Sequence, residues 1–219
     1  MRETSIFDII SPIMAGPSSS HTAGAVRLGL LARNIYSAQA SEIIFKLYNS
    51  YASTGKGHGT DKGLLAGFLG LRVDDERIKN IFDLEESKLL KYSFEFYEDF
   101  NRHPNAVDMI IEGENSLTLS GKSIGAGEVV IDKLNGFGVN LTGKYNCLLL
   151  IYEDIPHMIS KITSKIDTNI AELSCDRYAK GDKASMCISL DGELSADVVR
   201  QIKNMPRIYM TRYVQKLAS

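Results

Sequence analysis

Cysteine is scarce in this sequence, with three residues among 219, and the three lie far apart in the chain. A zinc or iron-sulfur site made by one chain needs cysteines grouped a few residues apart. We therefore expect no metal site built from the chain's own thiols, Cys147, Cys175 and Cys187. Reduced thiols buried on strands are the predicted arrangement.

An excess of charge of one sign and long apolar segments are also absent. Lys and Arg number 25 against 27 Asp and Glu, and the basic residues are scattered, which argues against nucleic acid as a partner. No apolar run reaches the roughly 18 residues of a membrane span. Residues 1–5 lead into amphipathic sequence without the apolar core of a signal peptide. We therefore expect a cytoplasmic protein without a nucleic-acid or membrane partner.

The hydrophobic pattern of residues 1–145 predicts helices followed mostly by strands. Apolar residues recur at helical spacing near the N-terminus, and strict alternation of apolar and polar residues, typical of half-buried strands, begins at Tyr92. Helices early and strands later indicate an α+β domain. The predicted helices are 22–36, 60–71 and 75–82, and the predicted strands are 43–48, 92–97, 107–112, 116–120, 128–133 and 137–141.

The last part of the chain predicts a second domain. The stretch Thr142-Gly143-Lys144-Tyr145-Asn146 marks the boundary, so the predicted domains are 1–145 and 146–219. Ser195 is the expected N-cap of a helix in this domain. The order βαββαβ is that of a ferredoxin-like unit. Its predicted elements are strand 147–152, helix 156–164, strands 169–178 and 184–190, helix 195–204 and strand 207–214.

A run of hydroxyl residues stands directly before the first predicted helix, in Gly16-Pro17-Ser18-Ser19-Ser20-His21-Thr22. Hydroxyls and free backbone N–H groups at a helix start, where the dipole carries about half a positive charge, suit a carboxylate or phosphate. The imidazole of His21 adds a proton donor or a base. The alternative is ordinary capping of the helix by Ser20 or Thr22, with the other hydroxyls in water.

A second segment, Ser53-Thr54-Gly55-Lys56-Gly57-His58-Gly59-Thr60-Asp61, is expected as a loop that opens the helix at 60–71. Its glycines let the backbone approach a ligand closely. A Gly-flanked imidazole, with an ordinary pKa of about 6.5, suits proton transfer. The alternative is a turn whose His58 merely faces water.

Together the two segments predict one pocket, provided that the strand between them brings the two helix starts together. A nucleotide is not indicated, because Gly121-Lys122-Ser123 lacks the upstream glycine of a phosphate-binding loop and no Gly-x-Gly-x-x-Gly occurs. The set instead suits binding and deprotonation of a small carboxylate-bearing molecule. The pocket would hold several hydroxyls with His21, His58, Lys56 and Asp61.

A third polar cluster, Asn101-Arg102-His103-Pro104-Asn105-Ala106, has two interpretations. The favoured one is a turn that starts the next strand, with Asn105 as its polar residue. In the other, His103 and Asn105 hydrogen-bond a ligand or the edge of the first segment.

These motifs, in this order, resemble one known family, the β chain of iron-sulfur L-serine dehydratases, over nearly the whole chain. The family's β domain is similar to the allosteric substrate-binding domain of some phosphoglycerate dehydrogenases, and the C-terminal part resembles an ACT regulatory domain. Two positions depart from the pattern. Ala126 stands where the family usually has glycine, and His157 follows Pro156 where amino-acid-binding ACT domains often carry glycine, which argues against effector binding there. The motifs are Phe7-Asp8-Ile9-Ile10 with 16–25, then 55–61, His103-Pro104-Asn105 and Ser123-Ile124-Gly125-Ala126-Gly127.

The resemblance implies a partner and a reaction. In the family an α chain holds a 4Fe-4S cluster through three of its cysteines, and the open iron acts as a Lewis acid on the substrate. This chain would then be the β subunit, deaminating L-serine to pyruvate and ammonia only with that partner. A homodimer of αβ units through the ACT domain is also implied.

The same resemblance implies roles for individual residues. His58 is the expected base, and His21 is the next candidate. Lys56 and Asp61 would orient His58. The implied substrate-binding residues are Ser18, Ser19, Ser20, Thr22, Lys56, Asp61, His103 and Asn105.

Two other hypotheses stay open. A non-catalytic sensor of an amino acid such as serine would bind it without a cluster-bearing partner, but has less use for His58 in an exposed Gly-rich segment. A detached regulatory fragment of a hydroxy-acid dehydrogenase is the other. It would not be the catalytic half, because the dinucleotide fingerprint is missing.

Overall fold

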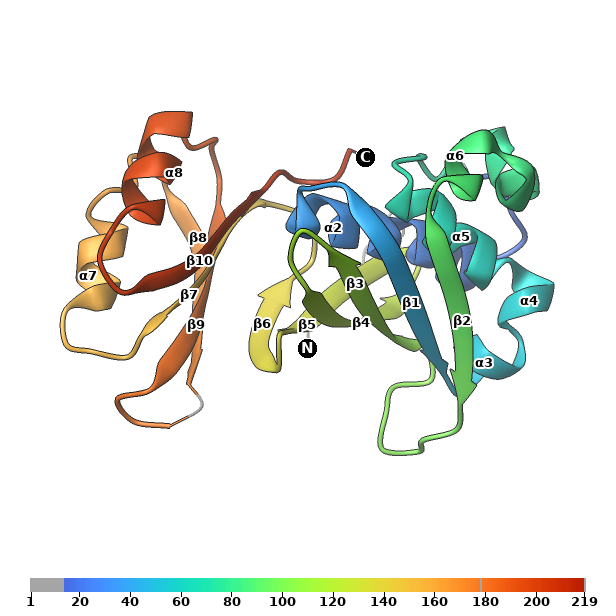
Figure 1. The fold of residues 1–219 in the computed structure, drawn as a ribbon, viewed down its shortest axis with the longest axis horizontal. Coiled ribbons are helices and arrows are strands. Elements are labelled where there is room, and N and C mark those ends of the chain that lie inside the picture. Colours follow the sequence, from blue (N-terminus) through green and yellow to red (C-terminus); the bar gives the residue numbers. More distant parts are fainter. Residues whose placement is uncertain (1–13, 178, 219) are drawn as a thin grey trace. The chain divides into compact units, whose positions relative to one another are not determined.

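The computed structural model describes residues 14–177 and 179–218, which form two compact units that divide between Ile131 and Asp132 (Figure 1). Helices and two sheets are present, so the predicted α+β class is confirmed. The motif residues Phe7 to Ile10, and Tyr178 at the end of a predicted strand, lie outside the described residues.

The first sheet has the strand order β2-β1-β3-β4-β5-β6. β1 runs parallel to β2 and antiparallel to β3, and β3 is antiparallel to β4. All six strands overlap the predicted ranges, although β4 continues to Gly125, beyond its predicted end at residue 120. The parallel pairing of β1 with β2, which places Tyr48 opposite Tyr97, is not visible in the local pattern. The strands are β1 (Ala40–Tyr48), β2 (Lys91–Tyr97), β3 (Ala106–Gly113), β4 (Leu117–Gly125), β5 (Glu128–Leu134) and β6 (Phe137–Leu141).

Two helices, α2 (Gly24–Tyr36) and α5 (Thr60–Phe68), pack on the apolar side of the strands of the first unit. Phe45 of β1 stacks on Phe94 of β2 and meets Phe68 of α5 edge-on, with ring centroids 5.1 and 6.5 Å apart. Burial of each large apolar side chain contributes about 1.5–3 kcal/mol. The core thus ties the parallel strand pair to α5. The fully buried side chains of β1 are Ile43, Phe45 and Leu47.

α2 and α5 lie against each other with their backbones in contact. A Cβ at Gly63 would lie 2.8 Å from the backbone oxygen of Thr22, and a Cβ at Gly67 would overlap the backbone oxygen of Val26. Because Thr22 meets Gly63 and Val26 meets Gly67, the helices run in the same direction and their first turns lie side by side. This packing brings together the two polar segments that the sequence singles out.

The chain between β1 and α5 is more helical than predicted. The segment 53–61, expected as a Gly-rich loop, contains the end of α3 (Ser50–Ser53) and the whole of α4 (Gly55–His58). Gly59 then adopts a φ of 71°, a left-handed conformation that favours glycine, and turns the chain into α5. The expected loop is wrong because glycine is about 1 kcal/mol less favourable than alanine in a helix, so local propensity hides these short turns.

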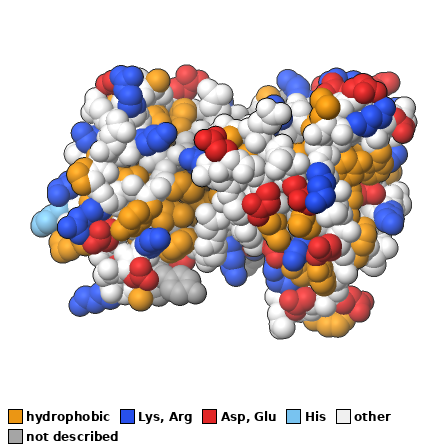
Figure 2. Space-filling view, in the orientation of Figure 1, with side chains coloured by type: hydrophobic (Ala, Val, Ile, Leu, Met, Phe, Trp, Pro, Cys, Tyr) orange, Lys and Arg blue, Asp and Glu red, His pale blue; other side chains and the backbone are white. Residues whose placement is uncertain are grey.

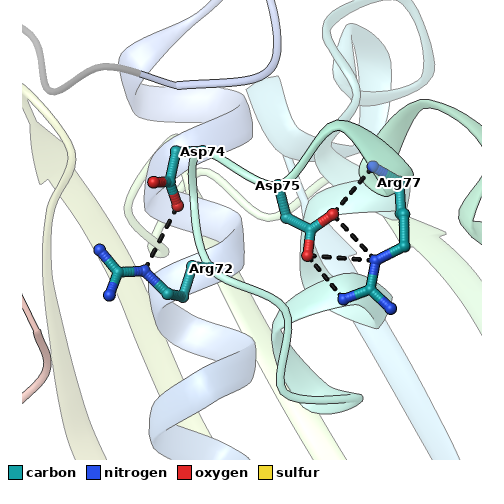
Figure 3. Close-up of polar contacts among 4 residues, drawn as sticks. All are labelled: Arg72, Asp74, Asp75 and Arg77. Carbon is teal, nitrogen blue, oxygen red and sulfur yellow. Dashed lines mark hydrogen bonds and ion pairs between the residues drawn. The ribbon is translucent and has the colours of Figure 1, made fainter.

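A 3-10 segment, η2 (Glu76–Asp83), follows α5 and replaces the α-helix predicted there. The carboxylate of Asp75 caps it by accepting hydrogen bonds from the backbone N–H and the guanidinium of Arg77, and Arg72 pairs with Asp74 at 3.4 Å (Figure 3). The cap satisfies a backbone donor and contributes about 0.5–2 kcal/mol, more than an exposed ion pair. The remaining short elements of this unit are the π-helical turn η1 (Ser19–Ala23) and α6 (Glu85–Lys88).

The second unit contains an antiparallel sheet with the order β10-β7-β9-β8. Ser195 caps α8 as predicted, its hydroxyl accepting a hydrogen bond from the Val198 N–H at 3.2 Å. Met158, Ile162 and Ile202 pack the two helices against the sheet. The ferredoxin-like order βαββαβ is confirmed. Its elements are β7 (Asn146–Glu153), α7 (Met158–Thr163), β8 (Ile170–Arg177), β9 (Lys183–Leu190), α8 (Ala196–Lys203) and β10 (Ile208–Val214).

β6 contacts the strands of the second unit, although the predicted boundary at 145/146 would assign it to the first domain. The Ser185 hydroxyl donates a hydrogen bond to the Gly138 carbonyl at 2.7 Å, and the Asn140 amide donates one to the Glu172 carboxylate at 2.8 Å. The compact units therefore divide within β5, earlier than predicted. Local composition does not reveal such long-range contacts.

Lys and Arg side chains and Asp and Glu side chains are interspersed on the face of each unit that Figure 2 shows. Within the described part of the chain, no helix is long and apolar enough to cross a membrane. The exposed large apolar side chains are Leu89, Phe96, Tyr97, Phe100, Ile124, Tyr145, Ile159, Leu173 and Tyr209.

Candidate active site

The first polar segment folds as the π-helical turn η1, which continues directly into α2. Ser18 caps this turn, because its hydroxyl accepts a hydrogen bond from the backbone N–H of His21 at 3.2 Å. π-helical turns are rare and are frequently found at functional sites. The cap is thus Ser18, and not Ser20 or Thr22 as the capping interpretation expects.

Ser19 and Ser20 keep polar groups available at this helix start. Within the described part of the chain, neither hydroxyl makes a hydrogen bond and neither backbone N–H has an acceptor. These donors stand at the positive end of the α2 dipole, where a carboxylate is stabilised.

Three hydroxyls surround the ring of His21. Nδ1 lies 3.4 Å from Oγ of Ser18, and Nε2 lies 3.2 Å from Oγ of Ser50 and 3.1 Å from Oγ1 of Thr54. Ser50 begins α3 and Thr54 directly follows it, so the chain after β1 holds the imidazole of the first segment. Both ring nitrogens have a hydroxyl partner, which fixes the position of the ring.

His58 lies beside His21, with the ring centroids 5.1 Å apart and the ring planes inclined by 50°. The His58 side chain is exposed, and its ring makes no hydrogen bond with a described residue. Its backbone is fixed instead, because the hydroxyl of Thr22 donates a hydrogen bond to the His58 carbonyl at 2.7 Å. The structure therefore brings together the two imidazoles singled out in the sequence.

The environment of His21 favours its neutral form. Burial lowers the pKa of His21, and the charge of a protonated His58 lowers it further, against a smaller rise from a hydrogen bond with Ser50. A neutral imidazole donates a hydrogen bond from one nitrogen and accepts one at the other. His21 is thus suited to accept a hydrogen bond or a proton at one defined atom.

Three other predicted site residues lie within three positions of His21 or His58 in the sequence. Among the described residues, neither Lys56 nor Asp61 makes a hydrogen bond or ion pair with either imidazole: Lys56 Nζ lies 5.2 Å from the centroid of the Phe96 ring, and Asp61 accepts a hydrogen bond from the backbone N–H of Lys62. Burial raises the pKa of Asp61. Thr22 is 2% exposed and its hydroxyl is already engaged.

Tyr51 connects two of the sequence motifs, the first segment and the third cluster, and is not among the predicted site residues. Its ring centroid lies 5.3 Å from that of His21, its hydroxyl donates to the Ser20 carbonyl at 2.9 Å, and its N–H donates to the Pro104 carbonyl at 3.2 Å. Burial raises the pKa of Tyr51, so the hydroxyl remains a donor. The available sequence signal is one aromatic residue in a small, polar stretch directly after a strand.

The third cluster supports the site through backbone hydrogen bonds. The Pro104 carbonyl holds Tyr51, and the Asn105 carbonyl accepts a hydrogen bond from the Ser123 N–H at 3.1 Å. The N–H of Asn105 donates to Nδ1 of His103, which is exposed. These bonds fit the interpretation of the cluster as a turn, while substrate binding by His103 and Asn105 stays a prediction.

The fourth motif packs against the start of α2. A Cβ at Gly24 would lie 2.5 Å from Oγ of Ser123, so only a glycine allows this approach of α2 to β4. Beyond Ser123, the φ angles of Gly125, Ala126 and Gly127 are 109°, 50° and 77°. Ala126 thus occupies a left-handed conformation that favours glycine, which explains why glycine is expected at this position.

The chain's own residues do not fit a 4Fe-4S cluster, which needs three or four thiolates around one site. Among the described residues, no group of His, Cys, Asp and Glu is arranged to hold a metal ion. Cys147 and Cys187 are buried with their Sγ atoms 3.0 Å apart, as the prediction of buried thiols expects. Cys175 is exposed, so that prediction is wrong for the third cysteine.

A family model and two relatives matched over nearly their whole length identify one family. A family model described as "Serine dehydratase beta chain" matches residues 5–134. The chain belongs to this family. The probable L-serine dehydratase beta chain of Bacillus subtilis (strain 168) is 36% identical over 212 residues, which cover 95% of this chain and 96% of that protein. The L-serine dehydratase beta chain of Peptoniphilus asaccharolyticus is 34% identical over 222 residues, which cover 98% of this chain and 100% of that protein.

The likeness to these beta chains includes both units, whereas the family model ends at residue 134. Both histidine segments, the third cluster and the fourth motif lie within the matched residues 5–134. The site therefore lies in the part of the chain that defines the serine dehydratase beta chain family. A partial match to the D-3-phosphoglycerate dehydrogenase of Bacillus subtilis (strain 168) is 24% identical over 159 residues, covering 70% of this chain and 30% of that protein.

Proposed function

We propose that this chain is the β subunit of an L-serine dehydratase, which deaminates L-serine to pyruvate and ammonia together with an α subunit. Membership of the serine dehydratase beta chain family supports this assignment. The single observation that carries it is the pair of imidazoles, His21 and His58, 5.1 Å apart at the shared start of α2 and α5.

The proposed α subunit carries the 4Fe-4S cluster. The beta-chain names of the relatives support a partner chain, and no group of His, Cys, Asp and Glu among the described residues is arranged to hold a metal ion. A cytoplasmic location is part of the proposal, and its support is that all three cysteines are free thiols.

The residues of this chain would bind the substrate and move a proton. The N–H and hydroxyl groups of Ser19 and Ser20, at the positive end of α2, would hold the substrate carboxylate. His58 would remove the α-proton, because its exposed ring is open to a substrate beside this helix start. His21 is the second candidate base. We assign Thr22 to positioning His58, since its hydroxyl binds the His58 carbonyl.

Replacing His58 by Ala tests the catalytic assignment. We expect the turnover of serine by the αβ enzyme to fall by about 100-fold or more, the usual contribution of a general base. Pyruvate release from L-serine would be measured without oxygen, on the purified chain mixed with the α chain. The matched control is His157→Asn in the second unit, because asparagine tolerates the left-handed φ of 70° at that exposed histidine. Near-normal turnover by a folded His58→Ala enzyme would contradict the assignment.

The same assay separates the enzyme subunit from a non-catalytic serine sensor. The second candidate is the sensor. Its support is the partial likeness to a phosphoglycerate dehydrogenase, in which the matched segment makes up 30% of that protein. We expect activity only when both chains are mixed. Saturable binding of serine by this chain alone, with an inactive mixture, would instead support the sensor.

We further propose that the second unit is an ACT domain through which two chains pair. Its βαββαβ order and antiparallel sheet support this, and the sheet offers two edge strands, β10 and β8. The side chains of β8 are largely exposed. An edge strand presents unpaired backbone donors and acceptors that a second copy can bind.

A further inference from the structure

The hydroxyl of Thr54 has one proton and two acceptors within reach, and the distances favour the backbone carbonyl of Ser50 over the ring of His21. Oγ1 of Thr54 donates a hydrogen bond to the backbone carbonyl of Ser50 at 2.8 Å, the usual bond of a hydroxyl one turn along a helix. The same Oγ1 lies 3.1 Å from Nε2 of His21. With its proton directed to the carbonyl, Thr54 can act toward His21 only as an acceptor.

The second partner of Nε2 is compatible with this direction. Oγ of Ser50 lies 3.2 Å from Nε2, and a serine hydroxyl accepts hydrogen bonds as readily as it donates them. At the other side of the ring, Ser18 Oγ lies 3.4 Å from Nδ1 and accepts the backbone N–H of His21. Its own proton is therefore available to Nδ1. The contacts on both sides of the ring are therefore satisfied when the proton of His21 is on Nε2, and the Thr54 contact is the one that selects this tautomer.

We propose that Thr54 is a positioning residue that holds His21 in the tautomer with the proton on Nε2, so that Nδ1 is the accepting atom and faces the Ser18–Ser20 turn. The catalytic meaning rests on the proposed function, in which the substrate lies at that turn. Bound serine would displace the long Ser18 contact of 3.4 Å and donate a hydrogen bond from its ammonium or hydroxyl group to Nδ1. His58 stays free for proton removal.

The tautomer can be measured directly on the full chain. Imidazole-¹⁵N-labelled protein would be studied by NMR above about pH 8, where ordinary imidazoles are neutral. The spectrum contains four histidines, and the signals of His21 are those lost in His21→Gln. We expect His21 to carry its proton on Nε2. A proton on Nδ1 would overturn the proposal.

Replacing Thr54 by Val removes the acceptor and keeps the shape of the side chain. Ser50 Oγ is then free to donate its proton to Nε2, which favours the other tautomer. We expect about a tenfold fall in the ratio of the Nε2–H to the Nδ1–H form, the net effect of one hydrogen bond. The conservative variant Thr54→Ser keeps the hydroxyl and should have the wild-type ratio of the two tautomers. The matched control is Ser53→Ala, an exposed neighbour whose hydroxyl makes no hydrogen bond with a described residue. An unchanged ratio in Thr54→Val would overturn the proposal.

The NMR experiment tests the role of Thr54, and the assay of the αβ enzyme tests the proposed function. Either hypothesis can be refuted without the other. If the wild-type enzyme is active and His21 is protonated on Nδ1, the proposed function stands and the role of Thr54 is refuted. If His21 has the expected tautomer and the mixture of chains is inactive, the proposed function is refuted. With both as expected, Thr54→Val should lower kcat/KM about tenfold, while Thr54→Ser and Ser53→Ala keep the wild-type value.

Discussion

At the scale of single residues, the two imidazoles of the site differ in what holds them. His21 has a hydroxyl on each side of its ring, and burial lowers its pKa. His58 is exposed and is fixed through its backbone carbonyl. A rigid neutral acceptor next to a more mobile imidazole is a suitable pair for holding a substrate and moving its proton.

Replacing His21 by Asn should flatten the dependence of stability on pH below neutrality. Because the pKa of His21 is lowered from its ordinary 6.5 in the folded protein, chiefly by burial and then by His58, the unfolded chain binds a proton first as the pH falls. The contribution of this residue is therefore complete above about pH 6.5 and is lost as the pH drops through that value toward the folded pKa.

Urea denaturation at a series of pH values checks this expectation. Between about pH 7.5 and 5, the free energy of unfolding should fall more for the wild type than for His21→Asn. Parallel curves for the two proteins would contradict the lowered pKa.

The sequence predicts the chemical residues of the site better than their supports. His21 and His58 stand out because histidines among serines and glycines are unusual for a core, and the structure places their rings together. Ser50, Tyr51 and Thr54 do not stand out, because hydroxyl residues and a tyrosine are ordinary in any chain. Their importance arises from contacts with residues about 30 to 50 positions away, which no local pattern contains.

At the scale of elements, the site depends on the contact between α2 and α5. The backbones touch at Gly63 and Gly67, which are four residues apart and so share one face of α5. The spacing of Gly59, Gly63 and Gly67 was a usable signal for close helix packing, and it explains why two segments far apart in sequence share one place. By contrast, the helical turns at 50–58 could not be predicted, since glycine disfavours helix locally.

Replacing Gly67 by Ala should destabilise the first unit. The added Cβ would overlap the backbone oxygen of Val26, so the two helices must separate, at a cost of about 1–3 kcal/mol. Urea denaturation measures the loss, and turnover of the αβ enzyme should fall as well because the first turns of α2 and α5 move apart.

The control is the same substitution where the chain offers room. A Cβ at Gly57 would meet nothing within 4 Å, and the φ of Gly57 is not positive. Gly57→Ala should therefore raise the free energy of unfolding by about 0.4–1 kcal/mol, through the lower entropy of the unfolded chain. Equal effects of the two substitutions would show that the helix contact is not close.

At the scale of the whole molecule, the chain combines a site-bearing unit with a ferredoxin-like unit. The order of elements in the second unit was predictable, because short apolar strands such as β7 and a helix capped by Ser195 follow simple local rules. The division within β5 was not, because it depends on contacts of β6 with β8 and β9. Composition marks a turn at 142–146, whereas compactness is decided by those contacts.

The proposed pairing through the second unit predicts the mass of the free chain in solution. Light scattering during size-exclusion chromatography should give twice the chain mass of 24.2 kDa. The exposed side chains of β8 and its unpaired edge supply the contact area and the backbone partners. A mass of 24.2 kDa at all concentrations would contradict the pairing.

Tyr51 has a consequence for how sequences of this family can diverge. One side chain and its own amide join the Ser20 carbonyl, the ring of His21 and the Pro104 carbonyl. Residues that share a partner do not act additively, so a change that shifts the Pro104 turn alters the effect of a change near Ser20. Related chains should therefore vary these segments in concert, as one inherited block, even though more than 80 residues separate Ser20 from Pro104 in the chain.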